Sequence, residues 1–202
     1  MEAGILVTAL IVVIATFLLF RIISLPIYTD PFGKKSVRLK HNKKIHTSKS
    51  WRLRMIDDAE RKGEKVILSK VGEFGPGMVD TVEYALKKGF SIKIVSSNEP
   101  VCESRNRIID LMEKFPEKFK YYVLDSYPLD HFAIIGSNIF IEVPHKWGSE
   151  DKESIGIENA HYYILNRFYE KFENTIKTAK KADIDFVRAM PCYLSSGQKY
   201  AE

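Results

Sequence analysis

Uncharged residues fill the start of the chain in a run long enough to cross a membrane. Residues 4–20 carry no charge, and apolar character resumes after Arg21 and continues through Leu25. A transmembrane helix needs roughly 20 predominantly apolar residues, and the Arg21 side chain can reach the headgroups from near the end of the segment. This pattern predicts one N-terminal transmembrane helix, with residues 1–27 as the membrane anchor.

A cleaved signal peptide is the competing interpretation of the same segment. Signal peptides begin with basic residues and end at a cleavage site made of small residues. This chain begins Met1-Glu2-Ala3, and residues 17–21 read Phe, Leu, Leu, Phe and Arg, which offer no such site. We therefore favour an uncleaved anchor.

Downstream of residue 50, the hydrophobic positions alternate between helical and strand spacing. The spacing predicts helices over 51–62, 78–88, 103–115 and 157–181, and strands over 65–71, 90–96, 119–124, 131–135 and 139–143. Gly136-Ser137-Asn138 separates the last two strands and predicts a β-hairpin. The order of elements predicts an α/β fold in which a largely parallel sheet, extended by the hairpin, carries helices on its faces.

Two segments without apolar periodicity flank this domain. Residues 28–50 combine proline, glycine and many charges, which predicts a basic juxtamembrane linker. Residues 183–202 are polar, which predicts a flexible tail. The globular domain is therefore expected over residues 51–182.

The positive charge of the chain is concentrated beside the predicted anchor. Nine Lys or Arg residues and no acid lie between Pro31 and Arg54, and removing these nine from the net charge of +5 leaves −4 for the remainder. Flanking basic residues tend to stay in the cytoplasm, so the C-terminal domain is predicted to be cytoplasmic. Anionic lipid attracts such a strip by roughly 1 kcal/mol per basic residue; nucleic acid is the alternative partner.

The two cysteines, Cys102 and Cys192, lie far apart along the chain, in a predicted helix and in the predicted tail. Neither position suggests a metal site or a disulfide framework. This usage is typical of a reducing compartment.

One ionisable residue stands out in the hairpin region. His131 opens the middle strand after an acidic turn, where its ring can face a cleft and change charge near neutral pH; a half-buried histidine that caps the strand is the plainer interpretation. His145 and Lys146 follow the hairpin and predict a basic, partly exposed loop. The plainer interpretation is an ordinary solvated loop.

Two further patterns have a structural explanation. The loop 72–77 precedes a helix, where anions can bind, but it lacks the Lys-Ser/Thr pair of a P-loop, so we expect a tight strand-to-helix connection. The aromatic residues of the last helix are expected to pack in the core: Tyr162, Tyr163, Phe168, Tyr169 and Phe172.

Residues 51–182 resemble one half of the phospholipase D superfamily fold. The resemblance is carried by the helix before KVILS, the helix 78–88, the strand IKIVSS, the sequence DHFAIIGSNIFI at 130–141, and the closing helix with FYEKF at 168–172. The family's signature is a His, a Lys two positions on and an Asp five beyond that. His131 matches the His, whereas Ala133 stands at the Lys position and Asn138 at the Asp position.

The resemblance implies a mixed sheet with flanking helices and a two-fold dimer that brings two such motifs together. In the family the His forms a covalent phosphohistidine and the Lys neutralises the phosphate oxygens. Ala133 supplies neither a charge nor a hydrogen bond, and loss of one such contact commonly costs roughly 10²–10³ in rate. We therefore expect a catalytically degenerate binding or scaffold module, without metal or cofactor, that holds a phosphate-bearing ligand or nucleic acid at His131, Asn138, His145 and Lys146.

Two alternatives stay open. The first is an active phosphodiesterase, a nuclease or phospholipase, in which His131 is the nucleophile and Lys146 replaces the missing lysine; residues 148–151, GSED, are similar to the family's Gly-Ser-x-Asn. The second is a membrane-tethered interaction domain whose site holds no ligand.

Overall fold

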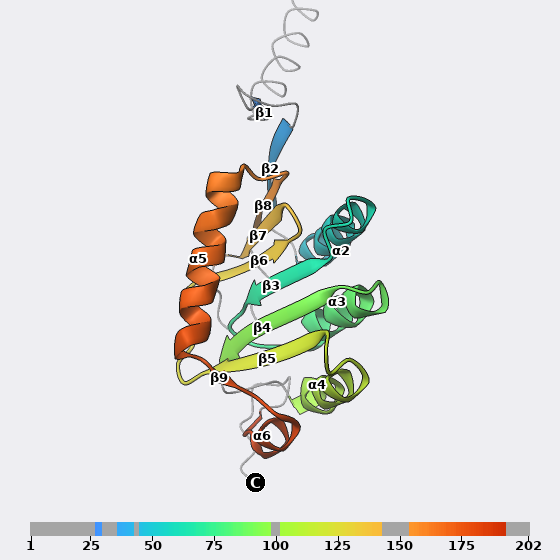
Figure 1. The fold of residues 1–202 in the computed structure, drawn as a ribbon, viewed down its shortest axis with the longest axis vertical. Helices are drawn as coiled ribbons and strands as arrows, with labels where there is room; N and C mark the ends of the chain where they lie inside the picture. Colours follow the sequence, from blue (N-terminus) through green and yellow to red (C-terminus); the bar gives the residue numbers. More distant parts are fainter. Residues whose placement is uncertain (1–26, 30–35, 43–44, 98–101, 143–153, 193–202) are drawn as a thin grey trace, which may run out of the picture.

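The structure, a computed structural model, describes residues 27–29, 36–42, 45–97, 102–142 and 154–192 (Figure 1). The predicted anchor, except Ile27, lies outside these residues, as do His145 and Lys146. None of the helices within the described ranges is long and apolar enough to span a bilayer.

One mixed sheet forms the centre of the molecule, in the order β1-β2-β8-β7-β6-β3-β4-β5-β9. Its strands are β1 (Ile27–Thr29), β2 (Ser36–Asn42), β3 (Val66–Lys70), β4 (Ser91–Ser97), β5 (Phe119–Leu124), β6 (His131–Ile135), β7 (Asn138–Glu142), β8 (Ser154–Glu158) and β9 (Lys180–Lys181). The pairs β3–β4 and β4–β5 are parallel, and the other pairs are antiparallel. The predicted hairpin is β6–β7, which turns at Gly136 with a φ of 57°.

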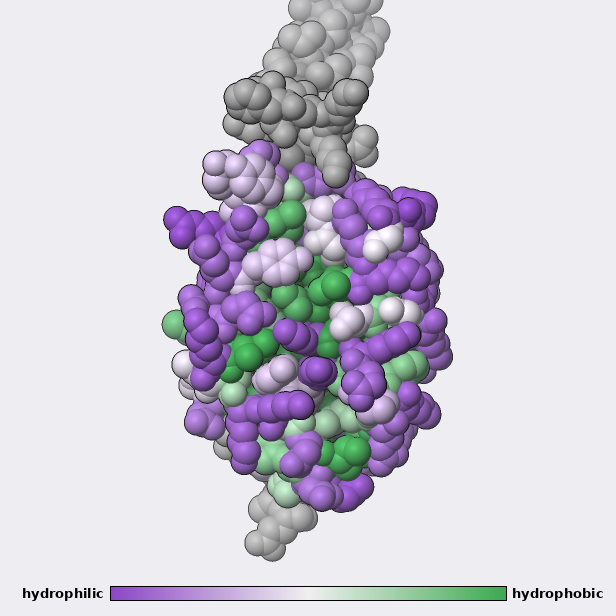
Figure 2. All heavy atoms as spheres, in the orientation of Figure 1, coloured by the Kyte–Doolittle hydropathy of each residue, from purple (hydrophilic) through white to green (hydrophobic). Residues whose placement is uncertain are grey.

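Helices cover both faces of the sheet. They are α2 (Ile45–Arg61), α3 (Pro76–Lys87), α4 (Cys102–Lys114), α5 (Tyr162–Thr178) and α6 (Ile184–Ala189). Helices α2, α3, α4 and α6 pack on one face over the larger core. Of the described helices, α5 is the one on the other face, where Phe172 is buried against Phe132 and Ile134 (Figure 1). In the space-filling view, hydrophobic residues show as separate patches among hydrophilic ones on this face of the molecule (Figure 2).

Part of the predicted linker belongs to the sheet. Strand β2 pairs with β8, with Leu39 opposite Ile157, and α2 begins at Ile45 instead of residue 51. In β2 the apolar Val37 and Leu39 alternate with polar and basic residues, which is a strand pattern. The high charge of the segment hides this pattern, because a basic stretch with proline and glycine before it is typical of a linker.

The predicted helix 157–181 is three elements. Ser154–Glu158 forms β8, Asn159 adopts a left-handed φ of 54° that turns the chain, and α5 then runs from Tyr162 to Thr178, before β9. Helical spacing continued by chance through Ile157, whose strand is specified by the neighbours β2 and β7.

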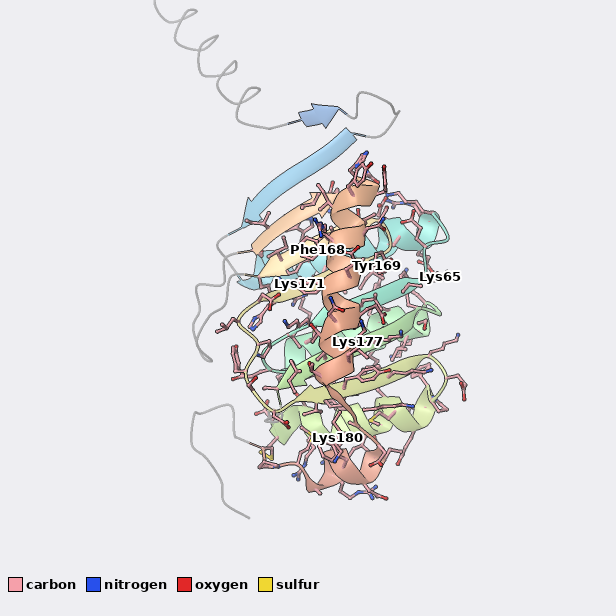
Figure 3. All side chains as sticks on the ribbon, turned by 60° about the vertical axis from the view of Figure 1, so that its left-hand side comes forward. Lys65, Phe168, Tyr169, Lys171, Lys177 and Lys180 are labelled. Atoms are coloured by element: carbon pink, nitrogen blue, oxygen red, sulfur yellow. A yellow bond between two sulfur atoms is a disulfide. The ribbon has the colours of Figure 1, made fainter. Side chains whose placement is uncertain are left out.

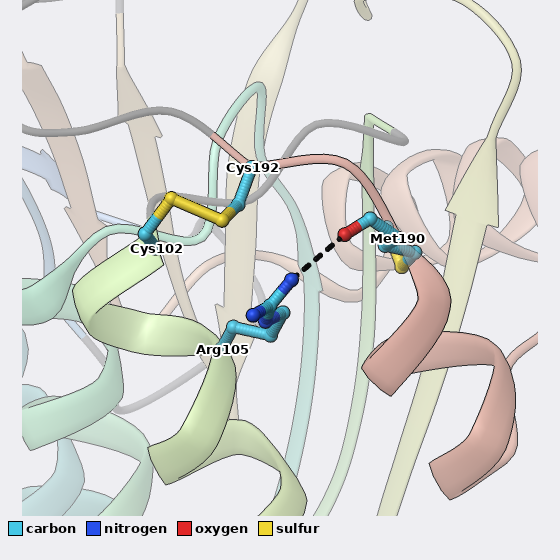
Figure 4. The surroundings of a disulfide bond; sticks show 4 residues. All are labelled: Cys102, Arg105, Met190 and Cys192. Carbon is cyan, nitrogen blue, oxygen red and sulfur yellow. Dashed lines mark hydrogen bonds between the residues drawn. A yellow bond between two sulfur atoms is a disulfide. The ribbon is translucent and has the colours of Figure 1, made fainter. Parts of the chain in front are cut away.

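The first part of the predicted flexible tail is folded. Asp183 caps α6 by accepting a hydrogen bond from the Phe186 amide at 2.7 Å, and Val187 is fully buried. Cys102 and Cys192 form a disulfide, and Arg105 donates to the Met190 carbonyl at 3.1 Å (Figure 4). The prediction of unpaired cysteines was wrong, because the contact between α4 and α6 that joins them is invisible in sequence spacing.

Candidate functional site

The candidate site lies where β6 begins and β7 ends. Glu142 is directly opposite His131, and Phe140 is directly opposite Ala133. Residues opposite each other share a face, with Cβ atoms about 5 Å apart, and Ala133 and Phe140 belong to the core beneath α2. His131, Ala133 and Glu142 therefore face α2, and His131 is only 3% exposed.

Tyr127 contacts the histidine from the preceding loop. The two ring centroids are 5.4 Å apart, and the Tyr127 ring also lies against Gly72, where an added Cβ would be 2.2 Å from the phenol. Burial, together with the carboxylates of Glu73 and Glu142, raises the pKa of Tyr127 above its ordinary value. His131 is thus buried against an aromatic ring whose position depends on a glycine.

The loop 72–77 is the tight connection that the sequence predicts. The Gly72 carbonyl accepts hydrogen bonds from the Ser97 amide at 3.0 Å and the Ser97 hydroxyl at 2.6 Å. Gly75 precedes α3, and its carbonyl accepts from the Met78 and Val79 amides, while Pro76 carries no N–H. The start of α3 therefore has few amides left for an anion.

Arg52, one of the nine basic residues beside the predicted anchor, lies next to the site. Arg52 on α2 bonds Glu142 through Nη1 and Oε1 at 2.6 Å, and its guanidinium carbon is 5.1 Å from the centre of the Phe140 ring. Glu142 and Phe140 are the strand partners of His131 and Ala133. A cation therefore covers the strand next to the His–Ala pair, and no local motif in the sequence indicates it.

The side chain of Asn138 is used up in hydrogen bonds that hold the fold together. It is fully buried; its amide nitrogen donates to Asp58 Oδ2 at 3.3 Å and its oxygen accepts from the Asn159 amide at 3.0 Å. Burial opposes ionisation of Asp58, but hydrogen bonds from Lys62 and Asn138 hold the pKa of that carboxyl below its ordinary value. An aspartate at 138 would bring a second carboxylate to Asp58, which explains the amide; the predicted role of Asn138 in ligand binding is not among these contacts.

No family model and no curated protein matches the sequence. Among solved structures, the chain matches Nuc, a phospholipase D family member from Salmonella typhimurium, with a TM-score of 0.58 and 14% identity over 72% of this chain and 98% of that one. It also matches phosphatidylserine synthase from Haemophilus influenzae with a TM-score of 0.53 and 10% identity, over 73% of this chain and 40% of that one. The domain has the phospholipase D superfamily fold.

A further structure with the same fold is that of TrmBL2, an archaeal chromatin protein with a novel mode of DNA binding. The TM-score is 0.53 with 17% identity, and the match covers 89% of this chain and 66% of that chain. At these identities the likeness concerns the phospholipase D fold alone. It confirms the sequence-based resemblance and the α/β architecture.

On the opposite face of the sheet, a second cluster of charges joins α5 to the start of β6. Asp130 bonds Lys70 at 2.5 Å and Lys171 at 2.6 Å, and Lys171 is labelled on α5 in Figure 3. Burial would raise the pKa of Asp130, but hydrogen bonds from Lys171 and Lys70 hold it below its ordinary value. These lysines neutralise Asp130 and lie on the face away from Ala133.

No group of His, Cys, Asp and Glu side chains within the described ranges could hold a metal ion. Of the predicted site residues, His131 lies at the candidate site, and Asn138 is buried in hydrogen bonds to Asp58 and to the backbone amide of Asn159.

Proposed function

We propose that this protein is a membrane-anchored, catalytically degenerate phospholipase D-like domain that serves as a binding or scaffold module for a phosphodiester-bearing ligand. The observation that carries the proposal is the state of the motif: His131 is retained but 3% exposed, and Ala133 replaces the cation beside it. A nucleophile must reach the phosphorus in line and needs stabilisation of the transferred charge. Burial of His131 removes the first condition, and Ala133 removes the second.

The family's arrangement supports the remaining parts of the proposal. Two copies of the domain meet about a two-fold axis and join two motifs into one ligand site. Residues 4–20 hold the assembly at the membrane, on the cytoplasmic side according to the basic strip. His145 and Lys146 lie outside the described residues and remain proposed ligand contacts. Phosphodiesters of lipid and of nucleic acid share the chemistry that this site would bind.

One observation favours an active phosphodiesterase as the second candidate. Arg52 faces the same side of the sheet as His131, and its buried Nε donates no hydrogen bond within the described part of the chain. In that enzyme, a His131 nitrogen would form a bond to phosphorus while the bond to the leaving oxygen breaks and water protonates the released alkoxide. A second water would then attack phosphorus, break the P–N bond, and release a phosphomonoester and free His131. Arg52 would then take the place of the lysine that Ala133 lacks.

A phosphodiesterase assay separates the two candidates. The full chain in detergent is incubated with bis(p-nitrophenyl) phosphate, a single-stranded oligonucleotide and phosphatidylcholine, beside the His131→Ala variant. We expect the same background release from both proteins. Turnover that His131→Ala abolishes, or a phosphate adduct on His131 in intact-mass analysis, would establish the enzyme instead.

Binding is measured with the same oligonucleotide and with vesicles that contain phosphatidic acid. Gly72→Ala should strengthen binding, because the new methyl group would displace the Tyr127 ring from its place against His131. Gly77→Ala is the matched control, since a Cβ there contacts nothing within 4 Å. Absence of binding by both variants would reject the ligand-binding part of the proposal.

A further inference from the structure

The start of α5 exposes large side chains that the sheet does not explain. Tyr162 is 54% exposed, Tyr163 66% and Ile164 39%; we call these three residues the tyrosine cap. The helical spacing predicted both tyrosines in the core, but the stripe of α5 that packs on the sheet runs through Leu165, Phe168 and Phe172. The prediction of core packing was wrong for Tyr162 and Tyr163, because a helix has one sheet-facing side and both lie off it.

The rings of the tyrosine cap are held together before any partner arrives. The Tyr162 and Tyr163 ring centroids are 4.0 Å apart, and the His161 ring stacks on Tyr163 with centroids at 5.4 Å and an interplanar angle of 22°. A His161 ring nitrogen also accepts a hydrogen bond from the backbone amide of Tyr163, which makes His161 the N-terminal capping residue of α5. Contact through this surface therefore costs little ordering of side chains.

Strand register places the tyrosine cap beside the point where the chain leaves the predicted anchor. Ile27 is opposite Arg38, and Arg38 is opposite Glu158, so the backbones of Ile27 and Glu158 are about 10 Å apart. Glu158 is four residues before Tyr162, and Figure 1 shows β1, β2 and the start of α5 at the same end of the molecule. The apolar segment ends at Leu25, and two residues span at most about 7 Å.

The short reach from Leu25 to Ile27, and from Ile27 to the start of α5, is comparable to the thickness of the headgroup region of a membrane. The headgroup region adds roughly 5–8 Å to each side of the hydrocarbon core. Tyrosine suits this zone, because its ring is apolar and its hydroxyl can bond water or phosphate oxygens. Arg167 on the next turn is 84% exposed at its side chain, where it pairs with Glu170 at 3.5 Å, and it would bring a cation close to the lipid headgroups.

We propose that the tyrosine cap lies in the headgroup region of the bilayer and is a second membrane contact beside the anchor. It fixes the domain with the β1 edge of the sheet at the membrane and the β9 edge away from it. Nine strands place these edges about 38 Å apart. The inference rests on the proposed anchor, and its partner is a lipid surface instead of a protein.

The test measures how close residue 163 lies to lipid. The full chain is reconstituted in phosphatidylcholine nanodiscs with or without bromine on the upper part of the acyl chains, which quenches nearby tryptophan. Tyr163→Trp is expected to lose emission in the brominated discs relative to the wild type. Lys177→Trp is the matched control on the same helix; Lys177 is exposed and lies 14 residues on, about 21 Å further along α5 (Figure 3).

Two outcomes overturn the proposal, and they are distinguishable. Equal quenching at positions 163 and 177, or none at 163, in a chain that resists alkaline extraction shows that the anchor is inserted and the tyrosine cap is not at the interface. Release of the wild-type chain by alkaline extraction refutes the anchor and the tyrosine cap together. The native tryptophans, Trp51 and Trp147, contribute the same background to every variant.

Discussion

At the scale of single residues, two arginines on α2 show how burial decides the value of an ion pair. Arg52 and Glu142 are 11% and 13% exposed at their side chains, whereas Arg54, paired with Glu158 at 3.4 Å, is 59% exposed. Breaking a buried pair leaves an uncompensated charge. Arg52→Ala is therefore expected to lower the free energy of unfolding by about 3 kcal/mol, and Arg54→Ala by less than about 1 kcal/mol. Urea denaturation of the full chain measures both changes, and equal losses of stability would show that Arg52 is not held in a buried ion pair with Glu142.

Two glycines make a second matched pair. A Cβ on Gly156 would be 2.1 Å from the Trp51 indole, which packs across β8 against Phe140. We expect Gly156→Ala to cost at least about 1–3 kcal/mol through overpacking, whereas Gly77→Ala in α3 should stabilise the chain by about 0.5–1 kcal/mol. Thermal unfolding midpoints should move in opposite directions. A neutral Gly156→Ala would mean that Trp51 does not lie on β8.

At the scale of elements, the Asp130 cluster fastens α5 to the sheet and should make that contact depend on pH. Because the folded-state pKa of Asp130 lies below the ordinary 3.8, its stabilisation is present above about pH 4 and is lost as pH falls through the folded-state value. Asp130→Asn should cost about 1 kcal/mol at neutral pH, since Lys171 is half exposed. The cost should disappear in acid. Urea midpoints from pH 3 to pH 7 measure it, and a constant difference would contradict the ion pairs.

The sequence predicted the elements whose signals are local. The β6–β7 hairpin, β5 and helices α3 and α4 were placed correctly or within two residues, because each has its own periodicity and its own turn or stop. Strands β2 and β8 were missed, because their identity depends on pairing with each other across more than 100 residues. At the site, His131 and Ala133 could be recognised in the sequence because they occupy positions of a short motif. Arg52 was not, because α2 reaches β7 only in the folded chain.

At the scale of the whole molecule, the disulfide closes the chain over the edge of the sheet. Cys102 begins α4 and Cys192 follows α6, so the bridge ties together residues 90 apart and holds the segment that buries Val187 and Met190. Disulfides persist in oxidising compartments, whereas the basic strip predicts a cytoplasmic domain. The state of these two thiols in cells therefore reports the compartment of the domain more directly than the charge pattern does.

Removal of the bridge tests its structural role. In the chain-entropy account, a loop of this length stabilises the fold by about 4–5 kcal/mol, so Cys192→Ser should lower the free energy of unfolding by an amount of that order. Arg105→Ala, which removes only the bond to the Met190 carbonyl, should cost about 1 kcal/mol. Amide exchange in residues 184–190 should rise strongly in Cys192→Ser, because α6 has only six residues and depends on its packing against α4, which the bridge holds in place. If Cys192→Ser left amide exchange in α6 unchanged, the packing of Val187 and Met190 and the Arg105 hydrogen bond would be enough to hold the helix, and the bridge would be dispensable.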